Sequence, residues 1–268
     1  MRYLLLFVTL WSCVSAAASR MVVLDVGEGQ AVLLQEGRHG VLVDTGHPGQ
    51  AAHVLDRLWT LGVEKLDYLI LTHLHPDHAG GYFRLRESFP ETTVFWNGQP
   101  LPRKSRSDMV RWVHQALRTD NRAAVIRAGD AFQWRGWRID VLWPELFVSQ
   151  DLNQHSLVLL LKKGDTEWLV MGDAGIPVEQ ELLKHRRLPR EVDLLVVGHH
   201  GAADATGQPF LRQVRPKRAV ISVNAGNIRG YPDEKVVRRL ERAGADVLRT
   251  DLDGEVIVDR NPSAVLPQ

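Results

Sequence analysis

A short segment rich in histidine, residues 72–78, constrains the fold of this chain more than any other feature. It follows directly on an apolar run, residues 66–71, that is typical of a buried strand. Within six consecutive residues of this segment lie four side chains that can bind a metal ion: His73, His75, Asp77 and His78. Side chains radiate from a strand-to-helix bend, so these groups converge on a small volume, and imidazole and carboxylate suit zinc, iron or manganese. The segment therefore predicts a metal-binding bend, and its dense spacing argues against a solvent-exposed polar loop.

Strand and helix patterns alternate at both ends of the chain, around a centre rich in strand patterns. In the first part, strands are predicted at residues 21–25, 31–34, 40–43 and 66–71, and helices at 53–61 and 83–87. In the centre we expect a strand at 92–96, a helix at 109–117, a meander of strands at 123–126, 132–134 and 137–143, and a hairpin of 156–161 with 167–171. The remaining helices are predicted at 178–184 and 233–243, and the remaining strands at 192–197, 219–223, 247–250 and 255–258. No linker or fixed-period repeat interrupts the pattern, which predicts one mixed α/β domain over residues 19–260.

The composition is that of an ordinary globular protein. Of the 268 residues, 44% are hydrophobic and 24% are charged, so the chain can bury a full core without disulfides. The formal net charge of +1 excludes a strong overall field toward nucleic acid or an anionic membrane, although a local basic groove is compatible with it.

The first residues have the pattern of a secretory signal peptide. A positive start precedes an apolar run, and residues 15–18 are small, so residues 1–18 are predicted to be removed on export to the periplasm or the medium. Two alternatives stay open, because residues 10–13 loosely resemble a lipoprotein box and the apolar run could remain as an uncleaved anchor. Either would give peripheral membrane association. Cys13, the only cysteine, lies in this segment, so the mature chain would have no thiolate ligand, and residues 261–268 are predicted to form a tail.

Residues 72–81, Thr-His-Leu-His-Pro-Asp-His-Ala-Gly-Gly, resemble the signature motif of the metallo-β-lactamase superfamily. Residues 44–46, Asp-Thr-Gly, are similar to the second-strand motif of that superfamily. The resemblance implies a four-layer αββα sandwich, a single α/β domain that binds two divalent metal ions, with zinc as the first expectation and manganese as the second. It also implies that one ion is bound by His73 and His75 and the other by Asp77 and His78, with Asp44 in a supporting role.

The superfamily also has an acidic ligand that bridges its two metals, and Asp173 is the candidate for it. Asp173 follows the hydrophobic run 167–171 in the sequence Met-Gly-Asp-Ala. Taken alone, an aspartate at this position is typical of a helix N-cap. Together with residues 72–78, the resemblance favours the bridging ligand.

Two adjacent histidines, His199 and His200, follow another apolar run, residues 192–197, and precede Gly201. Such a pair suits metal ligation, contact with a substrate oxyanion or, when protonated, donation of a proton to the leaving group. We expect His199 to be the metal ligand and His200 to contact the substrate as a catalytic residue. We also expect Asp77 to orient or deprotonate the attacking water.

A closer resemblance is to the extracytoplasmic hydrolase domain of ComEC-type DNA-uptake proteins. It rests on residues 24–31, Leu-Asp-Val-Gly-Glu-Gly-Gln-Ala, on a third motif that begins at Asn153, and on residues 172–173 and 198–201. Asn153 stands where the wider superfamily usually has a histidine, and we expect it to support the site or contact substrate. The resemblance implies hydrolysis of a phosphodiester, such as single-stranded DNA, by a metal-activated water. No stable protein partner is expected.

Two departures from that branch concern the substrate side of the site. Ala202 replaces the serine that follows His-His-Gly, and the late motif Asn-x-Tyr-Gly-His-Pro becomes Asn-Ile-Arg-Gly-Tyr-Pro at residues 227–232. The histidine lost there is a candidate metal or phosphate contact. Arg229 or Tyr231 could partly replace it as a substrate contact.

Other residues are weaker candidates. His155 could add a ligand if Asn153 does not, although a histidine next to a strand is more often a surface residue. Arg215 and Lys217 join Arg229 as candidate phosphate contacts. The tryptophans of the centre could stack on the bases of a single strand, although packing is their more usual role. They are Trp96, Trp112, Trp134, Trp137 and Trp143.

Two other functions stay open. Within the same fold the substrate could be a lactone, a thioester or a β-lactam, because a fold does not determine a reaction. The chain could also be a metal-binding scaffold without activity, although its intact set of candidate ligands argues against this.

Overall fold

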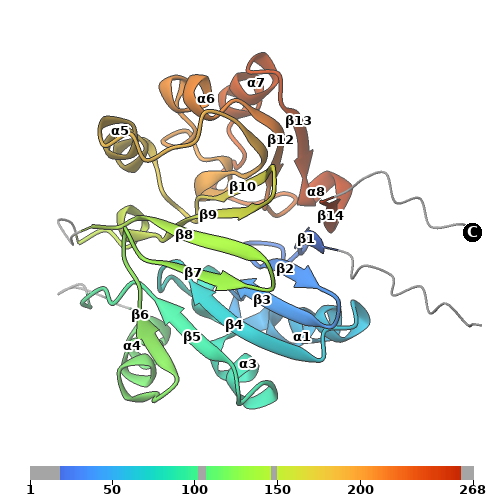
Figure 1. Ribbon diagram of the computed structural model, residues 1–268, viewed down its shortest axis with the longest axis vertical. Coiled ribbons are helices and arrows are strands. Elements are labelled where there is room, and N and C mark those ends of the chain that lie inside the picture. Colours follow the sequence, from blue (N-terminus) through green and yellow to red (C-terminus); the bar gives the residue numbers. More distant parts are fainter. Residues whose placement is uncertain (1–18, 102–106, 146–149, 261–268) are drawn as a thin grey trace, which may run out of the picture.

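Two seven-stranded sheets face each other at the centre of the molecule (Figure 1). The first sheet contains, in spatial order, β14 (Val256–Asp259), β1 (Ser19–Val23), β2 (Val32–Glu36), β3 (His39–Val43), β4 (Lys65–Leu71), β5 (Thr93–Trp96) and β6 (Ala123–Val125). The second contains β13 (Asp246–Arg249), β12 (Pro216–Ile221), β11 (Val192–Val196), β10 (Thr166–Val170), β9 (Val158–Lys163), β8 (Trp137–Trp143) and β7 (Ala131–Trp134). The computed structural model describes residues 19–101, 107–145 and 150–260, so the predicted signal peptide at 1–18 and tail at 261–268 lie outside the described residues.

The strands are apolar on both faces because each sheet separates two cores. In β1, Met21 and Val23 point into the space between the sheets, while Val22 points to the outer side of the first sheet. In β4, Ile70 lies between the sheets and Leu69 on the outer side. Successive side chains of a strand alternate between its faces, so a strand buried on both faces is a nearly continuous apolar run.

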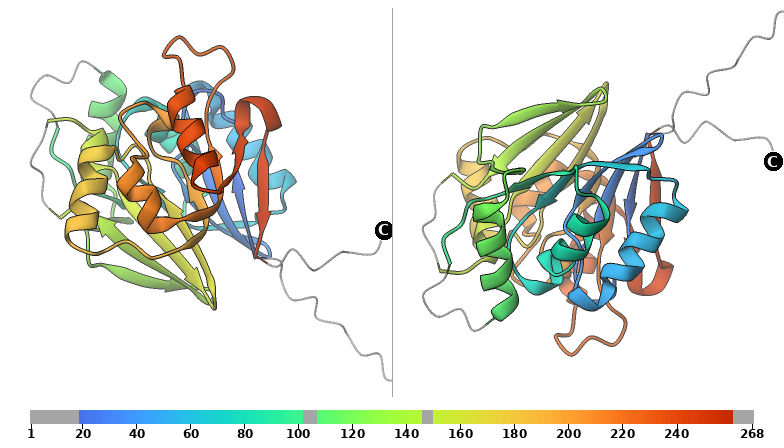
Figure 2. Two further views of the ribbon diagram at one scale, coloured as in Figure 1. Left: turned by 90° about the horizontal axis from the view of Figure 1, so that it is seen from above. Right: turned by 90° about the horizontal axis from the view of Figure 1, so that it is seen from below.

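Helices cover the outer face of each sheet (Figure 2). The first sheet is covered by α1 (Ala51–Thr60), α3 (Tyr82–Ser88) and α4 (Asp108–Thr119), and the second by α5 (Ile176–Lys184), α6 (Gln208–Val214) and α7 (Glu234–Arg242). The shorter elements are α2 (Pro76–Ala79), α8 (Thr250–Asp253) and the 3₁₀ turns η1 (Pro48–Gln50), η2 (Asn153–His155) and η3 (Gly198–Gly201). Buried residues at helical spacing, such as Val54 and Leu58 of α1, anchor each helix. The fold is therefore the expected four-layer αββα sandwich in a single domain.

None of the helices in residues 19–101, 107–145 and 150–260 combines the length and the apolar character needed to span a bilayer.

The strands predicted at the centre divide between the two sheets, so the expected meander is wrong. β6 pairs in parallel with β5 in the first sheet, whereas β7 and β8 form an antiparallel pair in the second. Between β6 and β7 the chain turns at residues 127–130, where the Arg127 amide donates to the Asp130 carboxylate. An apolar pattern indicates a strand but does not identify its neighbour.

The central tryptophans mostly pack inside the cores. Trp96, Trp134, Trp137 and Trp143 are at most 7% exposed, and such enclosed indoles cannot stack on a base. These four tryptophans therefore pack in the cores, which is the more usual role expected from the sequence. Trp112 differs because it lies on α4 with 56% of its surface exposed.

Parallel strands bring the candidate site together. β3, β4 and β5 run parallel to one another in the first sheet, and β10, β11 and β12 do so in the second. Carboxyl ends of parallel strands share one edge of a sheet, which is where open α/β sheets bind ligands. Residues 72–78 follow β4, Asp173 follows β10 and residues 198–201 follow β11, so all three candidate segments lie at such edges.

Candidate metal centre

The histidine segment bends sharply after β4. His75 has extended φ and ψ angles of −62° and 147° as the N-cap residue of α2, and Pro76 takes the first helical position. Proline suits this position because its φ is already helical and an N–H there would have no helical partner. The bend brings His73 Nε2 to 3.0 Å from His75 Nδ1, while the single turn of α2 carries Asp77 and His78.

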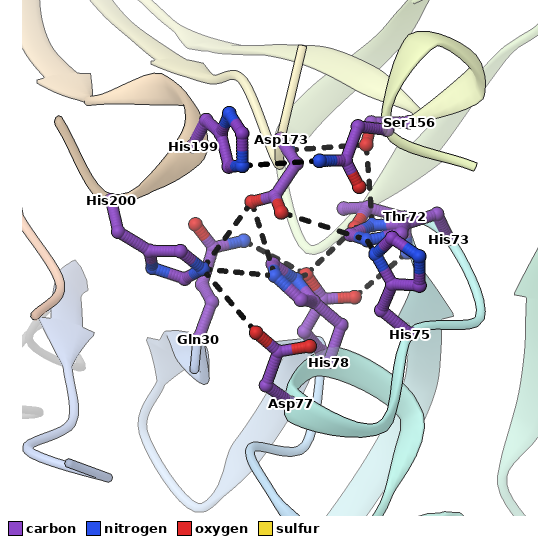
Figure 3. Close-up of polar contacts among 12 residues, drawn as sticks. Gln30, Thr72, His73, His75, Asp77, His78, Ser156, Asp173, His199 and His200 are labelled. Atoms are coloured by element: carbon purple, nitrogen blue, oxygen red, sulfur yellow. Dashed lines mark hydrogen bonds and ion pairs between the residues drawn. The ribbon is translucent and has the colours of Figure 1, made fainter. Parts of the chain in front are cut away.

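Two groups of side chains within the described residues have the geometry to hold a metal ion (Figure 3). The first group is His73, His75 and Asp173, and the second group is Asp77, His78 and His200. The candidate ligand atoms of each group lie within 4.8 Å of one another. In the second group, His200 Nε2 is 3.2 Å from His78 Nε2 and 3.8 Å from Asp77 Oδ2.

Asp173 is the member of the first group that faces the second group. His73 and His75 lie on one side of it and His200 on the other (Figure 3). Its Oδ2 is 3.7 Å from His73 Nε2, and its Oδ1 is 3.1 Å from His78 Nε2 and 3.4 Å from His200 Nε2. Asp173 is 3% exposed, and no described residue donates a well-aligned hydrogen bond to Oδ1. A buried carboxylate oxygen that faces imidazole nitrogens and lacks a donor fits a position shared by two cations.

Hydroxyl groups hold the outer nitrogen of His73. Its Nδ1 lies 3.2 Å from Thr72 Oγ1 and 3.2 Å from Ser156 Oγ. Thr72 Oγ1 donates its own proton to Asp44 Oδ2, and Ser156 Oγ accepts from the Asp173 amide. The Thr72 oxygen can therefore accept the Nδ1 proton, which leaves the Nε2 lone pair facing the first group, as in metal-binding histidines.

A carboxylate and a carbonyl oxygen hold the two histidines of the second group. His78 Nδ1 donates to Asp44 Oδ2 over 2.7 Å, and His200 Nδ1 donates to the Ser222 carbonyl oxygen over 2.9 Å. Both contacts place a proton on Nδ1, so the two Nε2 atoms point into the group. Asp44 is fully buried, has a φ of 62° and also accepts from the side chain of Gln30.

Burial and charge oppose each other in this cluster. Burial and the neighbouring His78 lower the pKa of His73 well below its usual range. Burial also disfavours a charge on His78, but Asp173 and Asp44 outweigh it and raise the pKa of His78 well above its usual range. Burial likewise works against the Asp173 carboxylate, yet His78 and His200 hold the pKa of Asp173 well below its usual range. The imidazole of His78 and the carboxylate of Asp173 thus favour each other's charged forms at the point where the ligand atoms of the two groups meet.

The loop before β2 connects the two strand ends. Gly29 has a φ of 127°, and a Cβ atom there would overlap the carbonyl oxygen of Asp77. The Gln30 amide donates to this Asp77 oxygen over 3.1 Å, and the Gly29 carbonyl accepts from the Ser222 hydroxyl. Because the Ser222 carbonyl holds His200, the loop spans the second group from Asp77 to His200.

The adjacent histidines of η3 point in different directions because both have left-handed backbone, with φ angles of 50° and 53°. His200 is 5% exposed and belongs to the second group. His199 turns away, and its Nε2 lies 3.1 Å from Asn153 Nδ2 while its Nδ1 lies 2.9 Å from Asp204 Oδ1. The geometry is thus opposite to the expected order, because neither group of the described residues contains His199.

Asn153 and His155 lie in η2 and outside both groups. The Asn153 amide contacts His199, and its buried Oδ1 has no hydrogen-bond partner in the part of the chain that the structure describes. His155 is fully buried, and its carbonyl oxygen accepts from Asn97 Nδ2. The expectation that His155 is a surface residue is therefore wrong, because the fold encloses this part of η2 and leaves His155 no exposed surface.

Arg229 and Tyr231 lie beside the second group, where they line a pocket with His200. Arg215 and Lys217 lie at the start of β12, whereas the candidate site lies at the carboxyl end of that strand. Lys217 also pairs with two acidic side chains. The expectation that Arg215 and Lys217 contact phosphate at this site is therefore wrong, because the strand holds them at the opposite edge of the sheet.

The sequence matches the family model of the metallo-beta-lactamase superfamily over residues 24–225. The chain belongs to this superfamily. The match includes the loop at Gly29, both strand ends and Ser222, so it covers every residue of the two groups. The protein is a superfamily hydrolase with two groups of side chains that can hold metal ions.

Curated relatives include competence and recombination proteins. The chain is 32% identical over 275 residues to ComE operon protein 3 of Bacillus subtilis (strain 168), with 94% of this chain and 34% of that protein covered. It is 32% identical over 241 residues to Recombination protein 2 of Haemophilus influenzae (strain ATCC 51907 / DSM 11121 / KW20 / Rd), with 88% and 28% covered. The chain thus spans about a third of the length of these relatives.

Solved structures support the fold of the superfamily. Igni18, described as a novel metallo hydrolase from Ignicoccus hospitalis KIN4/I, has a TM-score of 0.58 to this chain at 16% identity. The superposition covers 91% of this chain and 100% of that chain. At this identity the likeness concerns the αββα fold alone.

Several residues that hold the candidate ligands are not candidates in the sequence: Gln30, Thr72, Ser222 and Asp204. The available signal is a polar residue at the end of an apolar run. Thr72 follows the run 66–71, and Ser222 interrupts the run 219–223. Asp204 has no such signal, because the turn after η3 alone brings it to His199.

Proposed function

We propose that this hydrolase cleaves phosphodiester bonds, in single-stranded DNA or in a smaller diester, with two divalent cations in the paired groups. The observation that carries the proposal is the position of Asp173, whose two oxygens face different groups. When bound, two such cations lower the pKa of a water molecule and neutralise the charge that develops on the phosphate. Zinc suits the mixed nitrogen and oxygen donors, and manganese is the second choice.

The ligand assignment follows the geometry rather than the sequence order. The first cation would be held by His73, His75 and Asp173, and the second by Asp77, His78, His200 and the other oxygen of Asp173. His200 is assigned in place of His199 because its Nε2 faces Asp173 and His78. Asp44 would hold His78 in position through Nδ1.

Asp77 is proposed to take the proton of the attacking water. Its side chain is 12% exposed, against 3% for Asp173, so Asp77 lies at the more open side of the cluster. In the reaction, the water oxygen bonds to phosphorus and the bond from phosphorus to the leaving oxygen breaks. The proton passes from the water to the Asp77 carboxylate and finally to the leaving oxygen.

His199 and Asn153 are proposed to contact the substrate next to the first group. Asp204 holds His199 Nδ1, and Asn153 offers a buried oxygen without a partner among the described residues. A buried polar group that lacks a partner gains more from a bound ligand than an exposed one. Their position between the cluster and the surface suits a polar group that flanks the reacting bond.

Two observations favour a phosphodiester over a lactone, a thioester or a β-lactam. One of the two relatives is named Recombination protein 2, and recombination is a process of DNA. Arg229 also places a fixed positive charge beside the pocket at His200, and guanidinium groups match phosphate geometry well.

We also propose that the protein acts outside the cytoplasm. Residues 1–18 have the pattern of a signal peptide, and their cleavage or retention decides between a free and a membrane-associated protein. Cell fractionation with an antibody against the folded domain tests this. Recovery in the periplasm, the medium or the membrane fraction supports export, and recovery in the cytosol contradicts it.

The test of the proposed activity is hydrolysis by protein loaded with zinc or manganese, with elemental analysis of the same samples. The substrates are single-stranded DNA, bis-p-nitrophenyl phosphate and nitrocefin. We expect the wild type and the control Asp140→Asn, an acidic residue paired with Arg138, to cleave both diesters, and Asp173→Asn to cleave neither. Cleavage of nitrocefin without the diesters would overturn the proposal. Bound metal without turnover of any substrate would indicate a scaffold.

A further inference from the structure

A small pocket opens directly beside the second group. One wall is the loop at Glu28 and Gly29, and the other is the segment that carries Arg229 and Tyr231. His200 lines the same pocket, so a ligand there would lie next to a proposed metal ligand. Of its lining residues only His200 is part of the ligand assignment above, so the roles of Glu28, Arg229 and Tyr231 there remain to be assigned.

An ion pair joins the two walls of the pocket. Arg229 Nε lies 2.9 Å from Glu28 Oε1, and the two side chains are 50% and 44% exposed. Ion pairs between such exposed side chains contribute little to stability, because water screens them and both side chains lose freedom. Exchange of the Glu28 carboxylate for another anion at Arg229 therefore costs little.

The segment around Arg229 is held in a defined shape by one side chain. Asn227 Nδ2 donates to the carbonyl oxygens of Asn224 and Tyr231, over 2.8 Å and 2.6 Å, and its Oδ1 accepts from the Tyr231 amide over 2.9 Å. These bonds close residues 224–231 into a compact loop. Arg229 is thereby presented from a fixed backbone, which lowers the entropic cost of binding a ligand.

Tyr231 connects the arginine to the metal-binding cluster. Its ring centroid lies 5.6 Å from that of His199 and 6.5 Å from that of His200, and it is nearly parallel to His200, with 22° between the planes. The ring thus lies beside both histidines. Arg229 lines the same pocket as Tyr231 and His200.

Arg229 also has the chemistry that a phosphate contact needs. A guanidinium donates two parallel hydrogen bonds to a phosphate, which a tyrosine hydroxyl such as that of Tyr231 cannot do.

We propose that Arg229 binds a phosphate group of the substrate at the mouth of the pocket beside His200, and that Glu28 occupies Arg229 until this phosphate displaces it. The proposal rests on the proposed function for the identity of the substrate. It adds that the phosphate bound by Arg229 flanks the reacting one, so only a substrate with at least two consecutive phosphates makes this contact. Single diesters without a second phosphate would bind without this contact.

The test is calorimetric binding of the oligonucleotide (dT)8, made with phosphorothioate linkages that resist hydrolysis, to metal-loaded protein, with the variants Arg229→Ala, Glu28→Gln and the double variant. We expect Arg229→Ala to weaken binding roughly tenfold, because a charge-assisted contact to phosphate is lost. We expect Glu28→Gln to tighten it about threefold, because a competitor for Arg229 is removed. In the Arg229→Ala background, Glu28→Gln should have no effect. Arg238→Ala, which removes a similarly exposed arginine paired with Glu234, is the matched control and should bind as the wild type does.

The outcomes separate this inference from the proposed function. Unchanged affinity in Arg229→Ala, or an effect of Glu28→Gln that persists in the double variant, overturns the inference even if diesters are cleaved. Binding of (dT)8 through Arg229 without cleavage of any diester supports the inference and overturns the proposed function. Elemental analysis and thermal melting of each variant identify a loss of affinity that comes from lost metal or lost fold, in which case Arg229→Lys, expected to bind with intermediate affinity, replaces Arg229→Ala.

Discussion

The segment after β4 and the turn after β11 both direct histidines at one cluster, but their backbones do so in different ways. After β4, an extended His75 and one turn of helix point His73, His75 and His78 inward with ordinary backbone angles. After β11, His199 and His200 both have left-handed φ angles, and only His200 enters the cluster. The comparison shows that spacing in the sequence predicts ligands where the backbone is regular, and not where consecutive residues leave the common regions.

The left-handed turn at His199 and His200 needs more stabilising contacts than the bend after β4. A non-glycine residue in the left-handed region costs on the order of 1 kcal/mol, and the surrounding contacts must outweigh this cost twice. Asp204 and Asn153 hold His199, and the Ser222 carbonyl holds His200. The turn at His199 and His200 therefore depends on the nearby Asp204 and on Asn153 and Ser222 from distant segments.

The largest expected effect comes from the residue that the two strand ends share. Asp173→Asn removes the negative charge and replaces one carboxylate oxygen by an NH2 group, which cannot bind a cation, so Asp173 no longer serves both groups. We expect neither metal to remain after dialysis and diester hydrolysis to fall at least about 1,000-fold, or on the order of 4 kcal/mol. Metal content by elemental analysis and initial rates measure this. Retention of both metals in Asp173→Asn would show that the two ends bind metal independently.

Single replacements of His199 and His200 test which of the two adjacent histidines binds metal. We expect His200→Ala to lose one metal per chain, with second-metal affinity at least about 100-fold lower, and His199→Ala to keep both metals while turnover falls. His185→Ala, at the exposed end of α5, is the control and should keep both metals and full activity. Loss of a metal in His199→Ala but not in His200→Ala would restore the order expected from the sequence.

A smaller effect is expected from the loop that spans the second group. The Cβ of Gly29→Ala would overlap the Asp77 carbonyl oxygen, so we expect the second metal to bind about 10-fold to 100-fold more weakly and the first to stay bound. Gly244→Ala is a matched control, because Gly244 also has a positive φ, 89°, but has open space around it. Metal titration followed calorimetrically distinguishes them. Equal loss in both variants would point to backbone strain rather than to the contact with Asp77.

The smallest expected effect is on stability and concerns Glu179, which holds the loop after η3. Glu179 of α5 accepts from the Thr206 and Gly207 amides, and burial raises the pKa of Glu179 to about 7, against these two N–H groups. The pKa of Glu179 is thus higher in the folded protein than in the unfolded chain, where it is near 4.5. The contribution of Glu179 to the stability of the fold is therefore full below pH 4.5 and is lost as the pH rises through about 7. Between pH 6 and pH 8 we expect the unfolding free energy of the wild type to fall by about 1 kcal/mol more than that of Glu179→Gln. Urea unfolding at several pH values measures this, and parallel curves for the two proteins would contradict it.

Much of the fold can be predicted from local sequence patterns. The errors of this prediction arise where the pairing partner of a strand or its tertiary packing matters. Most strands and helices lie close to the predicted ranges, because apolar runs and helical spacing reflect burial within a single element. The meander expected over 123–143 is wrong because β6 joins one sheet and β7 the other. His155 is buried for a similar reason, since the tertiary packing that encloses it has no local signal.

The sequence by itself determined the chemistry of the metal centre. It supplied histidines and aspartates at strand ends, and the residues at 72–78 already imply a bend whose ligands converge. Tertiary structure alone decided that Asp173 faces both groups, that His200 rather than His199 turns inward, and that Arg229 meets Glu28 beside them. The physical reason is that a ligand type is a property of one residue, whereas the direction of a side chain depends on backbone angles that distant contacts stabilise.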